Sequence, residues 1–529
     1  MATTEGVLQH PVIGPFSGLS FLYKGEYLKE VQSPDCDNVI FDQGEIQKRG
    51  GFVPYGGGLQ LDNMVTGFAY ASGTYNNSKD YLIATTLNSC YYFNANSMVP
   101  ADANDTWCYT ANGQNCWTVG FTYVPSFEYF GASNYLVIAN AGHGIKYLSQ
   151  GGGSYKPSIG AFDTDSIVSY AKVVRNFLGF AVLLNINESA VWYKQRVRHN
   201  DGPANIEDWT GGTSGFSDLT GHNDEIVNAV VVDNKLVIFK RNSITIGNYY
   251  STTSPFGYDE DVINGYGLAG QNAMCTFPGG IFFMAKTPES GFIGPYVFNL
   301  QTVSPVGMDV YTEMIDSQPR ESTQDYTIHC VHVPERREVW TCYQKFGYGY
   351  NTIWVWNYVE NYWTKFTTTT ISSQAIYSGV DVYSSAYLGQ SNYAVLLGGY
   401  QGGYNVYKYT PTATVDRTSD NFTGYWASKD FYLEDAKGRV VPFNKRRCLF
   451  VKLYAYSSAS SSLSCSYSVD HGASYTTYAT VTLTTTPTVH ELPLDCYGNA
   501  IRFKFSGAGA GQFKIKGFSV HYLDLGVSR

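Results

Sequence analysis

Hydrophobic and polar positions alternate most regularly between Thr327 and Phe366. The alternation, and the turn-forming residues that interrupt it, predict four strands at 327–333, 338–344, 351–358 and 362–366. Four consecutive antiparallel strands in about 40 residues have the size of one β-propeller blade. Trp354 and Trp356 are two residues apart on a strand and therefore share a face, and we expect Trp340 to join them from the neighbouring strand. Such a small sheet needs neighbours against which to bury these rings.

The same pattern of an apolar strand, a turn and a second strand recurs along the chain. Segments such as DYLIATT, NYLVIAN, NKLVIF and GGIFFMA mark the apolar strands. Blocks of this kind lie at 64–93, 117–148, 166–194, 225–248, 271–299, 327–366 and 372–409. Seven blocks over about 390 residues predict a β-propeller of six or seven blades.

Two further regions flank these blocks. Residues 1–37 hold Pro and Gly without a repeated strand pattern, so we expect an irregular N-terminal arm. A polar segment from Asp416 to Thr423 follows the last block, and strands such as CLFVKLYAY and AIRFKFS alternate regularly after it. We therefore predict an all-β protein with an arm (1–37), a six- or seven-bladed β-propeller (38–424) and a C-terminal antiparallel β-sandwich (425–529).

The composition agrees with an all-β chain. Only 15% of the 529 residues are charged, while the sequence holds 54 Gly, 45 Tyr and 30 Phe. The net charge of −9 argues against binding nucleic acid through a basic surface, because phosphate neutralisation needs clustered Lys and Arg. The sequence has no run of about 18 apolar residues and no basic-then-apolar leader, so we expect neither membrane insertion nor Sec export.

The ten cysteines are scattered, without a CxxC motif or a dense framework. We expect free, mostly buried thiols in a protein that is made in a reducing host cytoplasm. Cys108 and Cys116 flank a Gly/Asn-rich turn, and whether they pair in a disulfide stays open.

Three connections between the blocks are long and rich in Gly, Ser, Asn and Asp, at 94–116, 198–223 and 249–270. Loops of this length in a compact domain are usually functional. The last connection holds the densest acidic run, Asp259, Glu260 and Asp261. A calcium loop would also need a central Gly and a distal Glu, so we interpret the run as a solvated or channel-facing acidic loop.

Gly265, Gly267 and Gly270 in the same connection spell GxGxxG. That fingerprint binds a dinucleotide only where it joins a strand to a helix whose N-terminus faces the pyrophosphate. Here an acidic segment precedes the glycines, and QNAMCTFPGG follows them without a helical pattern. We expect a flexible loop and no cofactor.

His329, Cys330 and His332 bring metal-ligand residue types together on one strand. Residues three apart on a strand point to opposite faces, so the two histidines cannot bind one ion together. We interpret all three as ordinary sheet residues and predict no metal site.

The segment SVDHGASY, from Ser468 to Tyr475, approximates the Asp-box turn of sialidase propellers. It occurs once, outside the expected propeller, and the sequence contains no nucleophile elbow, P-loop or HExxH motif. Glycan cleavage would need catalytic groups that no motif marks here, and we expect no enzymatic activity.

Several segments together resemble the propeller-type tail nozzle and tail hub proteins of short-tailed bacteriophages. They are NVIFDQGEIQKRGGF, VWYKQRVRHNDGPANIEDW, SVDHGASY, AIRFKFSG and FKIKGFSVHYLDLG. In that family a strand with a characteristic Asp, Gly and Arg-Gly pattern precedes the blades, and Asp42, Gly44, Arg49 and Gly50 match it. The terminal β-domain of the family carries a DGG-like turn, in which His471 stands here where a Gly is usual.

The resemblance implies a non-enzymatic virion protein that forms a homo-hexameric ring around the DNA exit channel of a short tail and docks to the tail adaptor and tail fibre proteins. Double-stranded DNA would pass without specific binding, which suits an acidic wall. Loops 198–223 and 249–270 are then the candidate gate, and the station in the tail stays open between nozzle, hub and collar. The alternatives are a glycan-binding or glycan-cleaving propeller that acts as a receptor-binding adhesin, and a cytosolic scaffold propeller.

Overall fold

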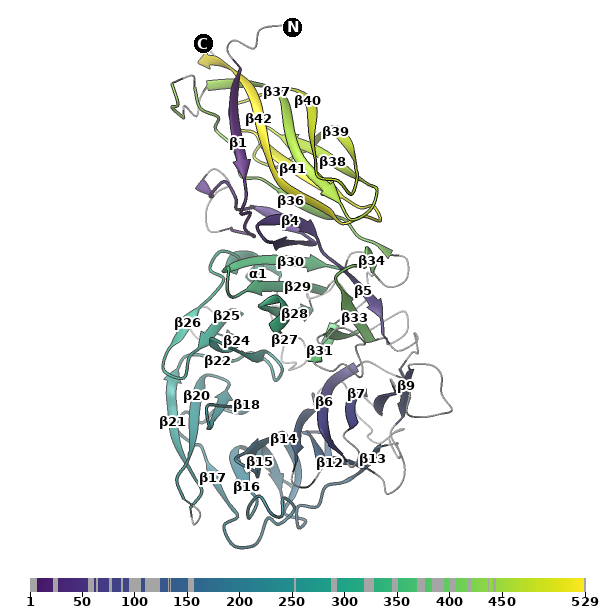
Figure 1. Cartoon of the computed structure of the whole chain (residues 1–529). Helices are drawn as coiled ribbons and strands as arrows, with labels where there is room; N and C mark the ends of the chain where they lie inside the picture. The colour runs from purple at the N-terminus through teal and green to yellow at the C-terminus, as the bar shows by residue number, and fades with distance from the viewer. Residues whose placement is uncertain are drawn as a thin grey trace.

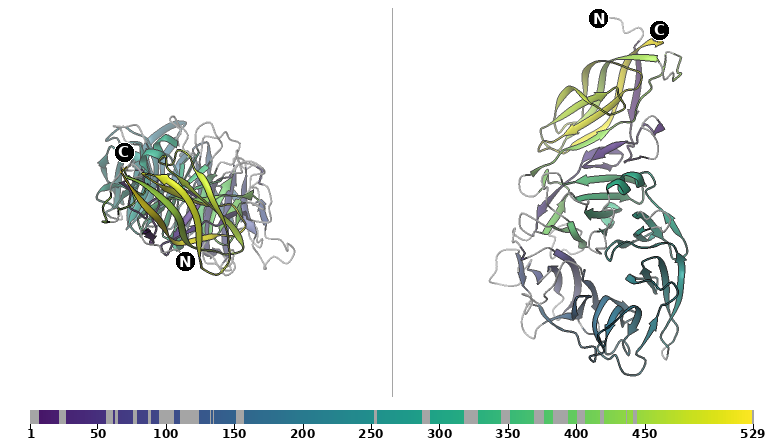
Figure 2. Two further views of the ribbon diagram at one scale, coloured as in Figure 1. Left: turned by 90° about the horizontal axis from the view of Figure 1, so that it is seen from above. Right: turned by 180° about the vertical axis from the view of Figure 1, so that it is seen from behind.

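The molecule has two β-rich parts, a propeller and a sandwich, stacked end to end (Figures 1 and 2). The computed structural model describes residues 7–21, 27–55, 61–62, 65–75, 79–86, 89–94, 106–109, 124–131, 133, 135–150, 157–251, 254–286, 293–317, 328–344, 351–368, 376–382, 394–399, 406–416, 420–435, 437–440 and 444–527. Within these residues nearly all regular structure is strand, and the α-helix α1 (Tyr311–Ser317) is a short exception. The all-β prediction is confirmed.

The propeller has seven blades in the part of the chain that the structure describes. Each of the first four blades is a sheet of four sequential strands: β6 (Val65–Tyr75), β7 (Lys79–Thr86), β8 (Cys90–Asn94), β9 (Thr106–Tyr109); β10 (Ser126–Phe130), β11 (Tyr135–Asn140), β12 (His143–Gln150), β13 (Pro157–Ala161); β14 (Val168–Phe177), β15 (Phe180–Glu188), β16 (Val191–His199), β17 (Gly215–Asp218); and β18 (Ile226–Val232), β19 (Lys235–Lys240), β20 (Ser243–Tyr249), β21 (Phe256–Asn264).

The fifth and sixth blades continue the pattern, and the seventh completes the ring. Their strands are β22 (Gly267–Leu268), β23 (Met274–Phe277), β24 (Gly280–Lys286), β25 (Ile293–Phe298), β26 (Val303–Pro305); β27 (Ile328–Val333), β28 (Glu338–Gln344), β29 (Asn351–Asn357), β30 (Tyr362–Thr367); and β31 (Ile376–Val382), β32 (Ala394–Gly399), β33 (Val406–Thr410). In the fifth blade β22 and β23 both pair with β24, so its inner strand is split.

A strand from the beginning of the chain closes the ring. β5 (Gly51–Pro54) pairs antiparallel with β33 as the outermost strand of the seventh blade, with Phe52 opposite Tyr409. The inner strands of neighbouring blades contact one another around the ring, including β31 of the last blade and β6 of the first. The seventh blade therefore draws strands from both ends of the propeller sequence, which ties the ring shut.

The sixth blade agrees with the four strands predicted between Thr327 and Phe366, to within one residue at each end. A short 3-10 turn, Pro334–Arg336, joins its first two strands, and Arg337 follows in the left-handed conformation with a φ of 56°. Trp356 pairs with Trp363 across β29 and β30, and their rings stack with centroids 6.0 Å apart.

The expectation that Trp340 joins Trp354 and Trp356 is wrong. Trp340 lies opposite Val355 in the register of β28 and β29, so its side chain occupies the other face of the sheet. There it packs edge-on against Tyr409, with ring centroids 5.1 Å apart, in the interface with the seventh blade.

The sandwich is built from two antiparallel sheets. One contains β3 (Val39–Asp42), β4 (Glu45–Lys48), β42 (Phe513–Val527), β37 (Asn444–Ser457) and β40 (Thr488–Gly498), with β1 (Leu8–Ile13) paired to β42. The other contains β2 (Asp35–Asp37), β36 (Gly424–Ala427), β41 (Arg502–Gly507), β38 (Ser461–Ser468) and β39 (Thr476–Leu483). Trp426, Phe505 and Phe518 meet between the two sheets.

The first strands of the chain belong to the sandwich, which differs from the expected division of the chain. β1 and β2 fall in the range 1–37, expected as an irregular arm, and β3 and β4 fall in the range 38–424, expected as propeller. All four pair with strands of the sandwich, because the edges of β42 and β36 offer unpaired backbone groups to them. The described propeller strands run from Gly51 to Thr410.

Candidate functional site in the axial cavity

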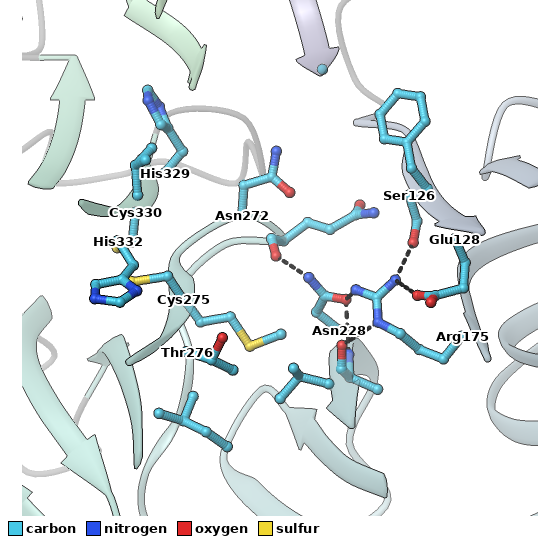
Figure 3. A pocket seen from close by; sticks show the side chains of 18 of the residues that line it. Ser126, Glu128, Arg175, Asn228, Asn272, Cys275, Thr276, His329, Cys330 and His332 are labelled. Atoms are coloured by element: carbon cyan, nitrogen blue, oxygen red, sulfur yellow. Dashed lines mark hydrogen bonds and ion pairs between the residues drawn. The ribbon is translucent and has the colours of Figure 1, made fainter. Parts of the chain in front are cut away.

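A cavity of about 650 Å³ lies between the inner strands of the propeller (Figure 3). Its described wall comes from six blades, through residues of β6, β10, β14, β18, β23 and β27. The volume lies within the range of about 300–1,000 Å³ that is usual for small-molecule sites. The inner strands of different blades therefore bring polar side chains together that are far apart in the sequence.

Arg175 of β14 organises one side of the cavity. Its Nη1 donates to Ser126 Oγ (2.8 Å) and its Nη2 to Asn228 Oδ1 (2.6 Å), and its Nε donates to the carbonyl of Ala229 (2.5 Å). These bonds join β10, β14 and β18, which are inner strands of three consecutive blades. The guanidinium is thus occupied by internal acceptors, and its first role is to hold the blades in position.

Glu128 is the carboxylate nearest to this arginine. Its Oε2 lies 3.9 Å from Arg175 Nη1, and 28% of its side chain is exposed. Burial raises the pKa of Glu128 to about 7, while the Arg175 charge and a backbone hydrogen bond from Asn176 oppose that rise. A carboxyl group that titrates near neutrality can bind a polar ligand or exchange a proton.

The opposite side of the cavity carries His329, Cys330 and His332 on β27, with Cys275 on β23 nearby (Figure 3). Burial lowers the pKa of His329 to about 3 and raises that of Cys330 to about 12. His332 accepts or donates one hydrogen bond with the Tyr358 hydroxyl, at 3.2 Å. Among the described residues no group of three or more His, Cys, Asp or Glu side chains is arranged to hold a metal ion.

Chemically, this cavity is suited to holding a small polar molecule. A glycosidase of the usual kind needs two carboxyl groups on either side of the scissile bond, about 5–9.5 Å apart. Of the described residues that line the cavity, Glu128 is the one carboxylate. The arrangement therefore lacks, in its described part, the second acid that this reaction requires.

The acidic run Asp259, Glu260 and Asp261 lies away from the cavity. The prediction of a long loop from 249 to 270 is wrong, because residues 256–264 form β21, the outermost strand of the fourth blade. The apolar residues Phe256, Tyr258 and Ile263 of this strand are half-buried against core clusters, but the acidic run separates them and breaks the alternation that reveals a strand. Whether the run faces a DNA channel stays a prediction.

Asp261 is anchored rather than solvated. It accepts hydrogen bonds from Ser243 Oγ (2.7 Å) and from Lys240 Nζ (3.1 Å), whose side chain is fully buried. Burial acts to raise the pKa of Asp261, but these hydrogen bonds and the Lys240 charge outweigh it and lower the pKa. Glu260 accepts from the Gly221 amide at 2.8 Å, which ties β21 to the neighbouring connection.

The glycines of the GxGxxG pattern serve close packing instead of a flexible loop. Gly265 has a φ of 84°, and a Cβ on Gly267 would collide with the Arg241 carbonyl. Gly267 begins β22, and the Gly270 carbonyl accepts from the Ala273 amide at 3.1 Å in a turn. The prediction that no helix follows these glycines is confirmed, since β23 comes next.

The connection from 198 to 223 is also fixed by its own side chains. Trp209 is fully buried, its amide donates to Asp165 (2.8 Å), and its carbonyl accepts from Arg198 (2.9 Å). Asp201 binds the backbone and hydroxyl of Thr213. The outermost strand of the third blade, β17, lies in the same segment. The expectation of one long free loop is therefore wrong.

Of the four positions that carried the family resemblance, Asp42 and Gly44 belong to a hairpin of the sandwich, and Arg49 and Gly50 lie at the junction between the two parts of the molecule. Asp42 and Gly44 flank the tight turn between β3 and β4, where Gly44 has a φ of 77°. Arg49 is fully buried and forms a bidentate pair with Asp416, with Nη2 2.7 Å from Oδ2. Its plane also lies 3.8 Å from the centre of the Phe422 ring. Gly50 allows the chain to pass closely by Pro411.

His471 has a structural role in the turn from 468 to 475. It adopts a left-handed φ of 60° and its Nδ1 lies 3.1 Å from Asp430, which also receives both Nε and Nη2 of Arg502. Asp470 binds Ser468 and Ser474, as an Asp-box-like turn would. This cluster joins β38 and β41 to the segment that contains Asp430. It lies in the sandwich, outside the propeller.

Eight cysteines have described side chains, and none of these eight is in a disulfide. Seven are buried and Cys275 is half-buried. Cys448 and Cys496 lie opposite each other on β37 and β40, a neighbourhood that the sequence pattern did not single out. Cys108 and Cys116, whose pairing the sequence leaves open, lie outside the residues whose side chains the structure describes. No helix in the described ranges is both long and apolar enough to cross a membrane.

The residues that define the cavity were missed by the sequence patterns. Ser126 and Glu128 share one strand, Arg175 and Asn228 lie on two others, and no motif spacing connects the three strands. A buried charge within a strand pattern is itself a signal, because such a charge must find a partner. That signal identifies Arg175 as important but does not name its partners.

Comparisons with known proteins add little about activity. No protein-family model matches the sequence, and no curated protein matches it. Among solved structures, the chain is similar to an exo-beta-1,3-galactanase from Phanerochaete chrysosporium with galactose, with 8% identity, coverage of 78% of this chain and 97% of that chain, and a TM-score of 0.25. A second structure of that enzyme, with beta-1,3-galactotriose, has 10% identity, coverage of 89% and 99%, and a TM-score of 0.24. At this distance the likeness carries no inference about activity.

Proposed function

We propose that this chain is a structural, non-enzymatic protein of a short phage tail, a nozzle or hub subunit that forms a homo-oligomeric ring around the DNA ejection channel. The junction between propeller and sandwich carries the proposal. Arg49 and Gly50, two of the residues by which the sequence resembles that family, lie at that junction, where Arg49 forms a buried ion pair and Gly50 closely approaches the backbone of Thr410 and Pro411. The resemblance therefore concerns the architecture of the whole chain.

The dimensions of the propeller support a channel between subunits rather than through one subunit. The axial cavity has the volume of a small-molecule site, whereas the major groove of B-DNA alone is about 12 Å wide. A duplex would have to pass outside the propeller, along surfaces contributed by several copies. The outermost strand β21, with exposed Asp259 and Glu260, offers an acidic surface that would repel phosphates.

The rigidity of the molecule suits a part that withstands a packaged genome. The ring is closed by β5, the sandwich contains strands from both ends of the chain, and Arg49 joins the two. Partners on this proposal are further copies of the chain, the tail adaptor and the tail fibre proteins.

The experiment is to purify virions whose genome encodes this chain, and to identify and count its copies in the tail by quantitative mass spectrometry and labelled antibody fragments. Several copies per virion, labelled close to the tail axis, would support the proposal. Label at the outer ends of fibres would favour the receptor-binding adhesin instead, and absence of the chain from virions would reject both virion roles and favour a scaffold protein.

A further inference from the structure

A second cavity, of about 500 Å³, opens on the third blade. We call it the distal groove and define it by Trp192, Lys194, Gln195, Asp218, Asn223 and Glu225. β16 and β17, which contribute to it, lie at the end of the propeller that is remote from the sandwich (Figure 1). The groove is separate from the axial cavity, with which it shares no lining residue.

Trp192 provides a flat aromatic surface at this groove. Its exposed fraction is 40%, whereas the other described tryptophans are buried. Tyr170 lies beside it, with ring centroids 6.4 Å apart and planes inclined by 23°. Asn187 on β15 is the register partner of both, so the two rings stand in one row across the sheet. The orientation of the Trp192 ring is thereby fixed before any ligand binds, which lowers the entropic cost of binding.

Two carboxylates in the groove are held in position by basic partners. Asp218 receives a hydrogen bond on each oxygen from Arg196, both at 2.7 Å, and keeps 38% of its side chain exposed. Glu225 receives hydrogen bonds from Lys172 (3.0 Å) and Asn185 (3.4 Å) on Oε1, and keeps 28% exposed. Arg196 also binds Glu188 and covers the ring of Tyr193, so Asp218 lies on the sheet face opposite Trp192. Each carboxylate oxygen can accept more than one hydrogen bond, so Glu225 retains acceptor capacity on the side of Trp192.

Donors and acceptors of the amide and ammonium type complete the lining. Gln195 donates to Asn223 Oδ1 at 2.8 Å, which leaves the Asn223 amide nitrogen available as a donor. Lys194 is exposed, and among the described residues no ion pair involves it. An exposed ring beside positioned carboxylates and amides is a combination that binds a molecule with one apolar face and a rim of hydroxyl groups.

We propose that the distal groove binds a neutral saccharide, with one sugar ring stacked on Trp192 and its hydroxyl groups hydrogen-bonded to Glu225 and Asn223. Phosphates and other anions are disfavoured, because the lining contains the carboxylates of Asp218 and Glu225 against the single ammonium group of Lys194. A lipid chain is disfavoured, because one aromatic ring in a polar groove offers too little apolar wall. The inference depends on neither the tail role nor the axial cavity.

Titration with a panel of neutral trisaccharides of glucose, galactose, mannose and N-acetylglucosamine tests the inference, with isothermal calorimetry and tryptophan fluorescence as readouts. At least one member should bind and change the emission of the exposed Trp192. Trp192→Ala should weaken that binding roughly tenfold or more, equivalent to about 1.4 kcal/mol. Asn223→Ala should weaken it by a smaller factor.

Tyr497→Ala provides the matched control, because Tyr497 is an exposed aromatic residue of the sandwich, with an exposed fraction of 52% against 40% for Trp192. The control should bind like the original protein. The inference is overturned if no member of the panel binds with a Kd below about 10 mM, or if Trp192→Ala binds as tightly as the control. Circular dichroism checks that each variant is folded, which is expected since Trp192, Asn223 and Tyr497 are exposed.

Discussion

Arg49 and Asp416 lie 367 positions apart in the sequence and form a bidentate ion pair, with Nη1 2.9 Å from Oδ1 and Nη2 2.7 Å from Oδ2. Both side chains are buried, with exposed fractions of 0% and 2%. Asp416 also accepts from the Phe52 amide at 2.9 Å, at the start of the strand that closes the propeller. One ion pair thus links the hairpin of the sandwich, the closing strand β5 and the segment that leaves the last blade.

Removal of this arginine should strongly destabilise the protein. Arg49→Met leaves Asp416 buried without a counter-charge, and breaking a buried pair in this way costs about 3–5 kcal/mol. Urea unfolding followed by tryptophan fluorescence should show a clearly lower midpoint. Arg447→Met is the control, because Arg447 pairs with the exposed Asp495 on the sandwich surface. Equal midpoints for both variants would contradict a structural role of the buried pair.

Gly50 should tolerate no side chain. A Cβ at this position would lie 2.7 Å from the Pro411 Cα and closer still to the Thr410 carbonyl, so the backbone at the junction must move. We expect Gly50→Ala to lower the free energy of unfolding by about 1–3 kcal/mol. Gly144→Ala is the matched control, because the nearest atom to its added Cβ, the Ser169 carbonyl oxygen, is 3.7 Å away. A junction that is loosely packed would tolerate both changes.

The outer strands show where the sequence pattern stops being informative. Middle strands such as β15 are buried along their whole length, and their apolar runs predict them well. The outermost strands β17 and β21 have only half-buried and exposed positions, and their sequences resemble polar connections. Their pairing comes from the unpaired edge of the preceding strand, which a pattern of side chains does not record.

The sequence pattern also could not predict which residues on two neighbouring strands share a face of the sheet. Trp354 and Trp356 share a face because both lie on β29, and this was predictable. The face of Trp340 depends on the register of β28 against β29, and a shift of one residue reverses it. The contacts between the polar cavity residues escape the pattern for a similar reason, because Arg175 meets Asn228 only after two blades have packed together.

Glu128 should make stability depend on pH near neutrality. Burial raises its folded pKa to about 7, so the folded state binds the proton more tightly than the unfolded state. This stabilisation is fully present below the unfolded pKa and is lost as the pH rises through about 7. Glu128→Gln lacks this term, and its melting temperature relative to the original protein should rise between pH 5 and pH 8.

The comparison with Glu128→Gln also defines the opposite outcome. A difference in melting temperature that is constant between pH 5 and pH 8 would show that the folded pKa of Glu128 is not raised. If the Arg175 charge dominated over burial, the folded pKa would be lowered, and the difference would change with pH only below about pH 5.

The buried thiols should react slowly. Burial raises the pKa values of Cys330 and Cys465 to about 12, so almost no thiolate is present at pH 8. Dithionitrobenzoate at pH 8 should leave both unmodified in the folded protein and modify both after denaturation, as mapped by peptide mass spectrometry. Rapid labelling of either cysteine in the folded protein would show that its sheet opens to solvent.

The most direct test of the tail assignment is a cryo-electron microscopy reconstruction of the tail, from virions whose genome encodes this chain. The account predicts that seven-bladed propellers with attached sandwiches are arranged in a ring around the tail axis. DNA or the emptied channel should run between the subunits, with the axial cavities of the propellers clear of it. A reconstruction in which the chain is absent from that ring, or in which DNA threads a single propeller, would contradict the account.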